Sequence, residues 1–396
     1  MRAVLIGVLA ATVTSVAALP ATADAKRCGS GQFDRGGTCT TYSAAARKID
    51  QLTRTVMAAE GARAAIVRVQ VGKQTVVSRG YGNSMEGVPA TPQMHFRPGA
   101  MVLPMLTTLL LQLQEQHQLD LGDPVSKWFP TYPNAATVTL RMLASSTSGY
   151  WDYIQENDPF IKDFHADVFR HWTDAELLSY AFPPEQPLAC DPGACFHYAH
   201  TNFVVLGQVV QKVTGRSVAS LMRSRFIRPL GLSETHISKL PAIPAPVLHA
   251  YTTDRGVYED STAWSPSWGV GKGMVMTSTA RDMVKELRAI GSGRLLSKSS
   301  MRQLTAPLSV GLPGDPPSID YGLGINLSNG WVLQNPQFNG YIGLSAYLRA
   351  RDITIVTENT NGPRVPDGRA ISGVITRQII QYLAPDQPLA AATPTP

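Results

Sequence analysis

Residue types that perform nucleophilic catalysis occur in this chain, but not at the spacings that common serine hydrolases use. A serine and a lysine three residues apart on a helix share one face, so the lysine can accept the hydroxyl proton. No serine here is followed by a lysine at that distance, and no Gly-x-Ser-x-Gly sequence occurs. Tyr198 and His200 stand two residues apart, and Ser146 and Ser148 are candidate nucleophiles for a histidine base. A histidine-assisted hydrolase is therefore one open alternative.

The first 25 residues have the features of a secretion signal. Arg2 precedes an apolar stretch over residues 3–19, and Ala23-Asp24-Ala25 forms a small-x-small cleavage site. Residues 1–25 are therefore predicted to be a signal peptide, with the protein secreted or held at the exterior of the cell envelope. No later apolar stretch reaches the ~20 residues that span a bilayer, so we expect no membrane span after cleavage.

Four cysteines in an exported chain predict two disulfides. Their clustering favours Cys28 with Cys39 and Cys190 with Cys195 among the three connectivities that four cysteines allow. The same spacing is poor for zinc, because ten residues separate the first pair and no histidines cluster beside either pair. We therefore expect local staples and no metal.

The overall composition describes a globular protein with a sizeable core. The chain has 396 residues, of which 44% are apolar and only 16% are charged. Its net charge is +6, but no run of five basic residues occurs. Binding to nucleic acid is therefore not expected.

The hydrophobic spacing predicts an α+β fold, with an antiparallel sheet built from both chain ends, flanking helices and an inserted, mostly helical region. Early strands are expected over 64–71 and 75–81, and late strands over 321–327, 345–349 and 353–358. Helices are expected over 43–60, 106–118, 140–146, 174–180, 203–213, 217–226, 279–290, 297–304 and 368–383.

The same pattern predicts how the chain is divided. Residues 26–42 form a disulfide-stapled N-terminal segment, and residues 43–383 form the main domain. Residues 384–396 are rich in Ala, Pro and Thr and are expected to be disordered. Residues 237–272 show no sustained period and are expected to be a long surface excursion beside a cleft.

Several blocks between Gly80 and Gly231 match one family in order and spacing. The resemblance rests on Arg79-Gly80-Tyr81-Gly82 and on FRPGAM, LDLGDPVSKWFP, TLRMLASSTSGY, FHYAHTNFVVLGQVVQKVTG and IRPLGLSET, with weaker matches further on. The chain resembles the β-lactamase-related serine hydrolases, which include class C β-lactamases, D-alanyl-D-alanine carboxypeptidases and esterases. The resemblance implies a cleft in which three catalytic motifs converge between the sheet and the helical region.

The key groups of these motifs are replaced in this chain. At the position of the family's S-x-x-K motif, Ala100 replaces the nucleophilic serine and Leu103 replaces the lysine base. In the second motif, Y-x-N, Tyr198 is retained but His200 replaces the asparagine. The third motif, Lys or His followed by x-Gly, aligns best with Phe338-Asn339-Gly340, where the cation is lost.

Pro104 follows the altered first motif and affects the expected start of its helix. Proline fits best at the first helical position, so the helix is expected to start later than the family's motif requires, with residues 100–103 in a turn. In such a turn, side chains at positions 100 and 103 would not share one face.

These replacements predict a secreted pseudoenzyme that keeps the fold and the cleft. An alkyl side chain at position 100 cannot form an acyl-enzyme. The resemblance suggests a peptidoglycan peptide or a small acyl-peptide as ligand, without a cofactor. Residues expected to line the binding site are Tyr150, Tyr198, His200, Phe338 and Asn339. Two alternatives stay open: an active serine hydrolase with relocated catalytic groups, and an interaction protein that uses residues 237–272.

Overall fold

The structure is a computed structural model that describes residues 28–390, apart from ten internal positions. Those positions are Glu156, Pro184, Gln186, Pro187, Lys239, Lys272, Gly273, Pro317, Asp367 and Gly368. The predicted signal peptide and residues 391–396 of the predicted tail lie outside the described residues.

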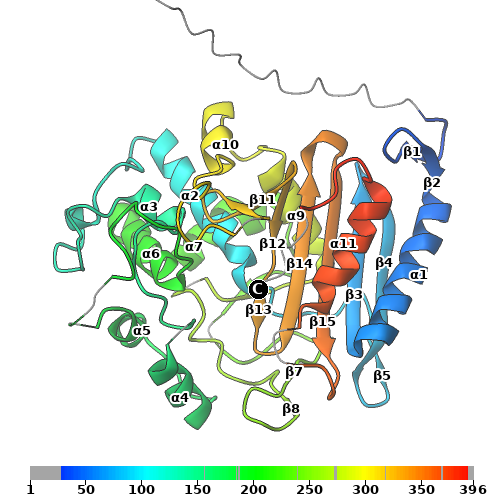
Figure 1. Cartoon of the computed structure of the whole chain (residues 1–396), viewed down its shortest axis with the longest axis horizontal. Helices are drawn as coiled ribbons and strands as arrows, with labels where there is room; N and C mark the ends of the chain where they lie inside the picture. The colour runs from blue at the N-terminus through cyan, green and yellow to red at the C-terminus, as the bar shows by residue number, and fades with distance from the viewer. Residues whose placement is uncertain are drawn as a thin grey trace, which may run out of the picture.

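A nine-stranded antiparallel sheet forms the centre of the molecule (Figure 1). Strand β15 (Ile353–Asn361), near the C-terminus, pairs with β3 (Ala62–Val71), near the N-terminus. The sheet is therefore assembled from both chain ends, as the sequence predicts. The other strands are β4 (Gln74–Met85), β5 (Val88–Pro89), β10 (Asp320–Tyr321), β11 (Asn326–Ser328), β12 (Trp331–Gln334), β13 (Gln337–Phe338) and β14 (Tyr341–Leu348).

Two helices cover one face of the sheet, α1 (Tyr42–Glu60) and α11 (Ile371–Leu383) (Figure 1). Helix α1 begins where the Thr41 side chain accepts a hydrogen bond from the Ala44 N–H, and it ends at Gly61 with a φ of 80°. The apolar stripes of both helices pack on alternate residues of β3, β14 and β15 and form one hydrophobic core.

The opposite face of the sheet packs against a larger helical region and a second core. Its central helices are α2 (Val102–Glu115), α6 (His200–Thr214) and α9 (Ala280–Gly291), and α2 is buried on almost every face. The remaining helices are α3 (Leu140–Ala144), α4 (Asp158–Ala166), α5 (Asp174–Ala181), α7 (Val218–Met222), α8 (Arg228–Leu230) and α10 (Lys298–Leu304). The α+β fold with a helical insert is thus confirmed.

Residues 237–272 are a surface excursion only in part: residues 240–242 and 254–257 are exposed, but other parts of the segment are buried. They contain one two-stranded ribbon, β7 (Tyr251–Thr252) with β8 (Glu259–Asp260). Their side chains Leu248, Ala250 and Trp264 are buried in the large core. The segment lacks periodicity because it fills an irregular space between the sheet and the helices rather than extending a regular element.

Both predicted disulfides are present. Cys28 pairs with Cys39, with Cα atoms 5.6 Å apart, and Cys190 pairs with Cys195, with Cα atoms 6.3 Å apart. The first disulfide ties Cys28, which precedes the hairpin of β1 (Gln32–Asp34) and β2 (Cys39–Thr41), to Cys39 at the turn end of that hairpin.

Peptide mapping of the mature protein under non-reducing conditions is therefore expected to yield these two linkages. Each pair is close in sequence and matches disulfide geometry, so both should form locally. Reduction before digestion is the control and should release all four cysteine peptides. A Cys39 to Cys190 linkage would contradict the pairing.

Residues 384–390 pack against the body of the protein, contrary to the disorder expected for that part of the tail. Ala384 and Leu389 are buried in the core beneath α1 and α11. The indole N–H of Trp331 donates to the Gln387 carbonyl at 2.7 Å, and Asn329 donates to the Pro388 carbonyl at 2.9 Å. Composition alone missed this packing because the anchoring groups belong to β12 and its turn.

Two glutamates are buried on the helical side of the sheet without hydrogen-bond partners. Glu286 lies on α9, and burial together with the nearby Asp282 carboxylate raises its pKa from 4.5 to about 8. Glu358 lies on β15, and burial raises the pKa of its carboxyl group well above the ordinary value. Burial therefore favours the protonated, neutral form of both carboxyl groups in the folded protein.

Candidate functional site

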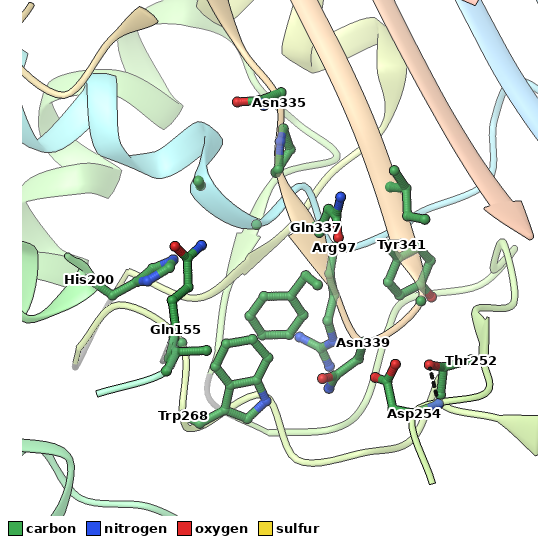
Figure 2. A pocket seen from close by; sticks show the side chains of 18 of the residues that line it. Arg97, Gln155, His200, Thr252, Asp254, Trp268, Asn335, Gln337, Asn339 and Tyr341 are labelled. Carbon is green, nitrogen blue, oxygen red and sulfur yellow. Dashed lines mark hydrogen bonds between the residues drawn. The ribbon is translucent and has the colours of Figure 1, made fainter. Parts of the chain in front are cut away.

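A cavity of about 670 Å³ lies between the edge of the sheet and the helical region (Figure 2). One wall comes from the turn before α2 and from β13, and a second from the segment that leads into α6. Residues 251–254 and 268–270 of the segment expected to be a surface excursion form a third wall, so this segment does border a cleft. Aromatic side chains dominate the lining, including Phe160, Phe164, Phe196, Tyr198, Tyr251, Tyr258, Trp268, Tyr321, Phe338 and Tyr341.

Ala100 lines this cavity at the start of α2, where the family places its nucleophile. It lies in a 3-10 turn over Gly99–Met101, and α2 follows from Val102. Leu103 is the second residue of α2, is fully buried in the core and does not line the cavity. Neither position offers a hydroxyl, an amine or an imidazole.

Pro104 does not delay the helix as far as expected. It is the third residue of α2, within the first turn, where a backbone N–H lacks an intrahelical partner in any helix. Proline is tolerated there for that reason, and the expected turn over residues 100–103 is shortened to Gly99–Met101.

His200 is held by Asp152 at the first turn of α6. The Asp152 carboxylate accepts hydrogen bonds from the His200 ring Nδ1 at 2.9 Å and from the His200 backbone N–H at 3.2 Å. The Asp152 side chain is only 1% exposed, so this contact is shielded from water. Because Nδ1 donates to the carboxylate, Nε2 carries the lone pair of the neutral ring.

Tyr198 lies on the Nε2 side of the same imidazole. Its hydroxyl is 3.5 Å from Nε2, and the two rings meet edge to face. Burial, with smaller contributions from Tyr321 and Asp152, raises the pKa of Tyr198 well above its ordinary value. Tyr198 is therefore a neutral phenol at pH 7. Asp152, His200 and Tyr198 thus form a row in which His200 and Tyr198 line the cavity and Asp152 lies behind them.

The loop closed by Cys190 and Cys195 positions this row. Residues 189, 193 and 197 donate backbone hydrogen bonds to Gly149, Thr147 and Ser146. Gly149 has a φ of 77°, and a Cβ atom there would lie 2.0 Å from the Cys190 carbonyl oxygen. Residues 145–149, the SSTSG block, thus support the segment that carries Tyr198 and His200.

Ser146 and Ser148 are not placed to act as nucleophiles. Both are fully buried and neither lines the cavity. The Ser148 hydroxyl donates to the Asn202 side chain at 2.6 Å. A nucleophile from this block, which the sequence left open, is therefore not available to His200.

Four of the five predicted binding residues line the cavity, and Tyr150 does not. Tyr198, His200, Phe338 and Asn339 are at its wall. Tyr150 is fully buried under the helical region, and its hydroxyl donates to the Pro133 carbonyl at 2.8 Å. Its place in the sequence beside the SSTSG block suggested the cleft rim, but its ring packs inward against Phe182.

The sequence did not single out three other residues of the site. Asp152 follows the SSTSG block closely, but only the fold brings it to His200, 48 positions away. Trp268 stacks on Phe338 with ring centroids 4.5 Å apart, and Arg97 lines the cavity before α2. The only sequence signal for Arg97 was its place in the FRPGAM block that matches the family.

The described lining is poor in groups for covalent catalysis and for metal binding. Among the described residues at the cavity wall there is no serine, cysteine or lysine. Across the part of the chain that the structure covers, no group of three His, Cys, Asp or Glu side chains converges on a metal site. No helix within the described ranges is both long and apolar enough to cross a membrane.

Comparison with known proteins agrees with this fold and cavity. The family model described as Beta-lactamase matches residues 49–371. The chain therefore belongs to the β-lactamase family, which includes serine hydrolases and penicillin-binding proteins.

Individual relatives are distant. The chain is 24% identical to penicillin-binding protein 4* of Bacillus subtilis, over 67% of this chain and 58% of that protein. It is 28% identical to the teichoic acid D-alanine hydrolase of Staphylococcus aureus, over 40% of this chain and 37% of that protein. The chain thus spans less than two thirds of the length of these two relatives.

Solved structures match over more of their length. The D-stereospecific amidohydrolase from a Streptomyces species is 27% identical, with a TM-score of 0.72 and coverage of 86% of this chain and 98% of that one. The D-amino acid amidase from Ochrobactrum anthropi, solved with D-phenylalanine, is 21% identical, with a TM-score of 0.71 over 85% and 99% of the two chains. The second likeness concerns the fold alone.

Proposed function

We propose that this protein does not catalyse the acyl-enzyme reaction of its family and instead binds a ligand in the cavity. The observation that carries the proposal is Ala100, whose methyl group occupies the cavity position at which the family's mechanism needs a hydroxyl. The buried Leu103 cannot accept a proton. The described residues that line the cavity include no serine, cysteine or lysine that could take over either role. The covalent step therefore lacks both its nucleophile and its base.

The proposed ligand is a peptidoglycan peptide or a small acyl-peptide that carries a D-amino acid. Supporting this class, two relatives are named a teichoic acid D-alanine hydrolase and a D-stereospecific amidohydrolase. The aromatic lining of the cavity suits an apolar side chain. Two disulfides favour an oxidising compartment, which supports the proposal that the protein is secreted or lies at the exterior of the cell envelope.

Incubation of the mature protein with benzylpenicillin or with a fluorophosphonate is expected to leave its intact mass unchanged. Both reagents report a reactive serine, and no described residue at the cavity wall is a serine. A penicillin-binding protein treated in parallel controls for reagent quality. A stoichiometric adduct on any serine would overturn the proposal.

A second candidate function rests on the contact between Asp152 and His200. A carboxylate that fixes Nδ1 of a histidine leaves Nε2 able to take a proton from water, which is general base catalysis. The candidate is a hydrolase that uses water directly. Product release from an acyl-D-alanyl amide without a protein adduct, abolished by His200→Asn, would favour this function over binding alone.

A further inference from the structure

Three side chains at the cavity wall carry buried hydrogen-bond donors that have no partner. They are Arg97 through Nε and Nη1, Trp268 through Nε1, and Asn339 through Nδ2. Each side chain is at least nine-tenths buried. In the view of Figure 2 the three lie between His200 on one side and Asp254 on the other. Buried donors are normally paired, so four unpaired donor atoms on three side chains at one cavity indicate a place for acceptor atoms.

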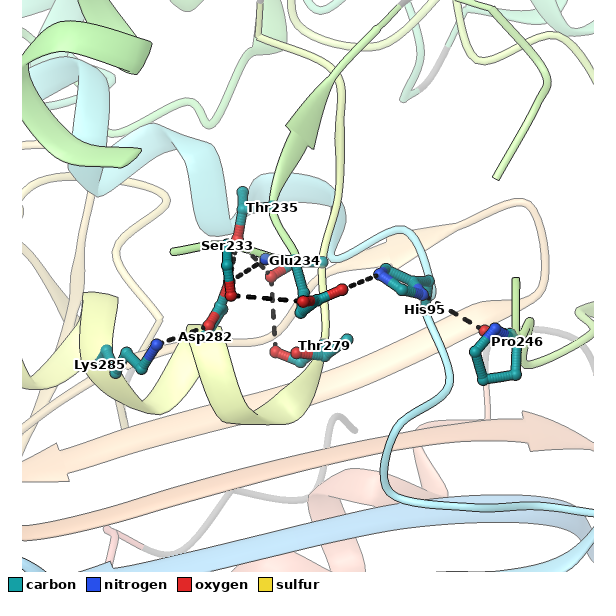
Figure 3. Close-up of polar contacts among 9 residues, drawn as sticks. His95, Ser233, Glu234, Thr235, Pro246, Thr279, Asp282 and Lys285 are labelled. Carbon is teal, nitrogen blue, oxygen red and sulfur yellow. Dashed lines mark hydrogen bonds and ion pairs between the residues drawn. The ribbon is translucent and has the colours of Figure 1, made fainter. Parts of the chain in front are cut away.

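The position of Arg97 is fixed by the residues beside it. The His95 N–H donates to the Pro246 carbonyl, and the Leu248 N–H donates to the His95 carbonyl. Phe96 exchanges two backbone hydrogen bonds with Ser278, each 3.0 Å long. The His95 ring lies between the Pro246 carbonyl and the Glu234 carboxylate, as Figure 3 shows. The backbone before Arg97 is therefore held from several sides.

The guanidinium group itself is only partly satisfied. Nη2 donates to the carbonyls of Leu240 and Pro241, at 3.1 and 2.8 Å. Among the described residues, no carboxylate forms an ion pair with Arg97. Burial lowers the pKa of Arg97 to about 10, so the group remains a cation at pH 7. A buried cation without an anion is unfavourable, and an anionic ligand would relieve that cost.

We propose that Arg97, Trp268 and Asn339 form a binding site for a carboxylate group of the ligand. This inference rests on the proposed ligand-binding function and specifies its chemistry: an acyl-amino acid or peptide with a free C-terminal carboxylate. The donors supply charge and hydrogen bonds to the carboxylate oxygens. The stacked rings of Trp268 and Phe338 supply an apolar surface beside it for a side chain.

The test compares N-acetyl-D-phenylalanine with its C-terminal amide, by isothermal titration calorimetry on the oxidised mature protein. The two probes differ only in the charge of the terminal group. The wild-type protein is expected to bind the acid at least tenfold more tightly than the amide. Arg97→Met should remove this preference, whereas Arg47→Met, at an exposed arginine on α1, should retain it.

Two further variants keep the test valid if Arg97→Met does not fold, since Arg97 also anchors residues 240–241. Trp268→Phe removes the indole N–H and keeps a ring stacked on Phe338, and Asn339→Ala removes the amide. Each should weaken binding of the acid severalfold and leave binding of the amide unchanged. Equal affinities for acid and amide, insensitive to these variants, would overturn the carboxylate site.

A third probe, N-acetyl-D-alanyl-D-alanine, separates this inference from the proposed ligand class. Phenylacetate serves as a further probe that has a carboxylate but no peptide bond. If N-acetyl-D-phenylalanine and phenylacetate bind in an Arg97-dependent manner and the dipeptide does not bind, the carboxylate site is supported and the peptide class is wrong. If the dipeptide and its amide bind equally well, the peptide class is supported and the carboxylate site is wrong. Failure of all probes to bind would overturn both.

Discussion

Replacing Glu286 with glutamine is expected to stabilise the fold by up to ~5 kcal/mol at pH 8.5 and to leave its stability nearly unchanged at pH 4. The Glu286 carboxyl is buried without a hydrogen-bond partner, and its pKa rises from 4.5 to about 8 on folding. The folded state therefore binds a proton that the unfolded state releases above pH 4.5. The contribution of the protonated Glu286 carboxyl to the free energy of unfolding is therefore fully present below pH 4.5. This contribution is lost as the pH rises to about 8. Glutamine removes that loss.

Urea unfolding of both proteins at several pH values between 2.5 and 8.5 measures this difference. Glu176→Gln is a matched control of opposite sign, because hydrogen bonds from Thr173 and Arg170 lower the pKa of that carboxyl to about 2. Its contribution is present above pH 4.5 and disappears as the pH falls towards 2. Parallel stability curves for wild type and Glu286→Gln would mean that Glu286 ionises freely in the folded protein.

Restoring the family's first motif by Ala100→Ser with Leu103→Lys is expected to destabilise the protein and not to create useful hydrolysis. The Leu103 side chain is fully buried in the apolar core, so a lysine there would have to lose its charge or displace the helix. The cost is roughly 4 kcal/mol or more. In the motif alignment predicted from the sequence, His200 and Phe338 stand in place of the family's second and third polar groups, and one missing preorganised group can reduce the rate ~10²-fold.

Nitrocefin turnover and thermal unfolding of the double variant measure these effects. Ala100→Ser alone is the control, because the site faces the cavity and should accept a hydroxyl without loss of stability. That single variant should form no acyl adduct, since Leu103 cannot act as a base. A rate close to that of an ordinary β-lactamase for the double variant would show that the cavity is otherwise intact.

The fold was predictable because its elements carry strong local patterns. The β-rich runs of β3 and β4 and the apolar stripe of α1 are readable without tertiary information. A sheet assembled from both chain ends was predictable because strands are expected near both ends, and the structure adds that β15 pairs with β3. The ordered residues 384–390 were missed because their stability comes from Trp331 and the core beneath them, not from their own composition.

Residues of the candidate site were predictable from the sequence only where they belong to a motif of the family. Ala100, Tyr198 and His200 were found because neighbouring blocks fixed their register. Asp152 and Trp268 could not be assigned, because their roles arise from contacts with residues distant in sequence. Tyr150 was misplaced because a residue's position beside a motif does not determine whether its side chain points to the cavity or into the core.

The packing of both ends of the described chain against each other has a consequence for how the protein can be attached to something else. Arg35, in the stapled hairpin, donates to the Tyr382 carbonyl and stacks over the Tyr382 ring. The hairpin, α1 and residues 384–390 belong to the core on one face of the sheet, and the cavity wall belongs to the core on the other. A tether, tag or fused domain joined ahead of the stapled hairpin would therefore start on the face of the sheet opposite the cavity.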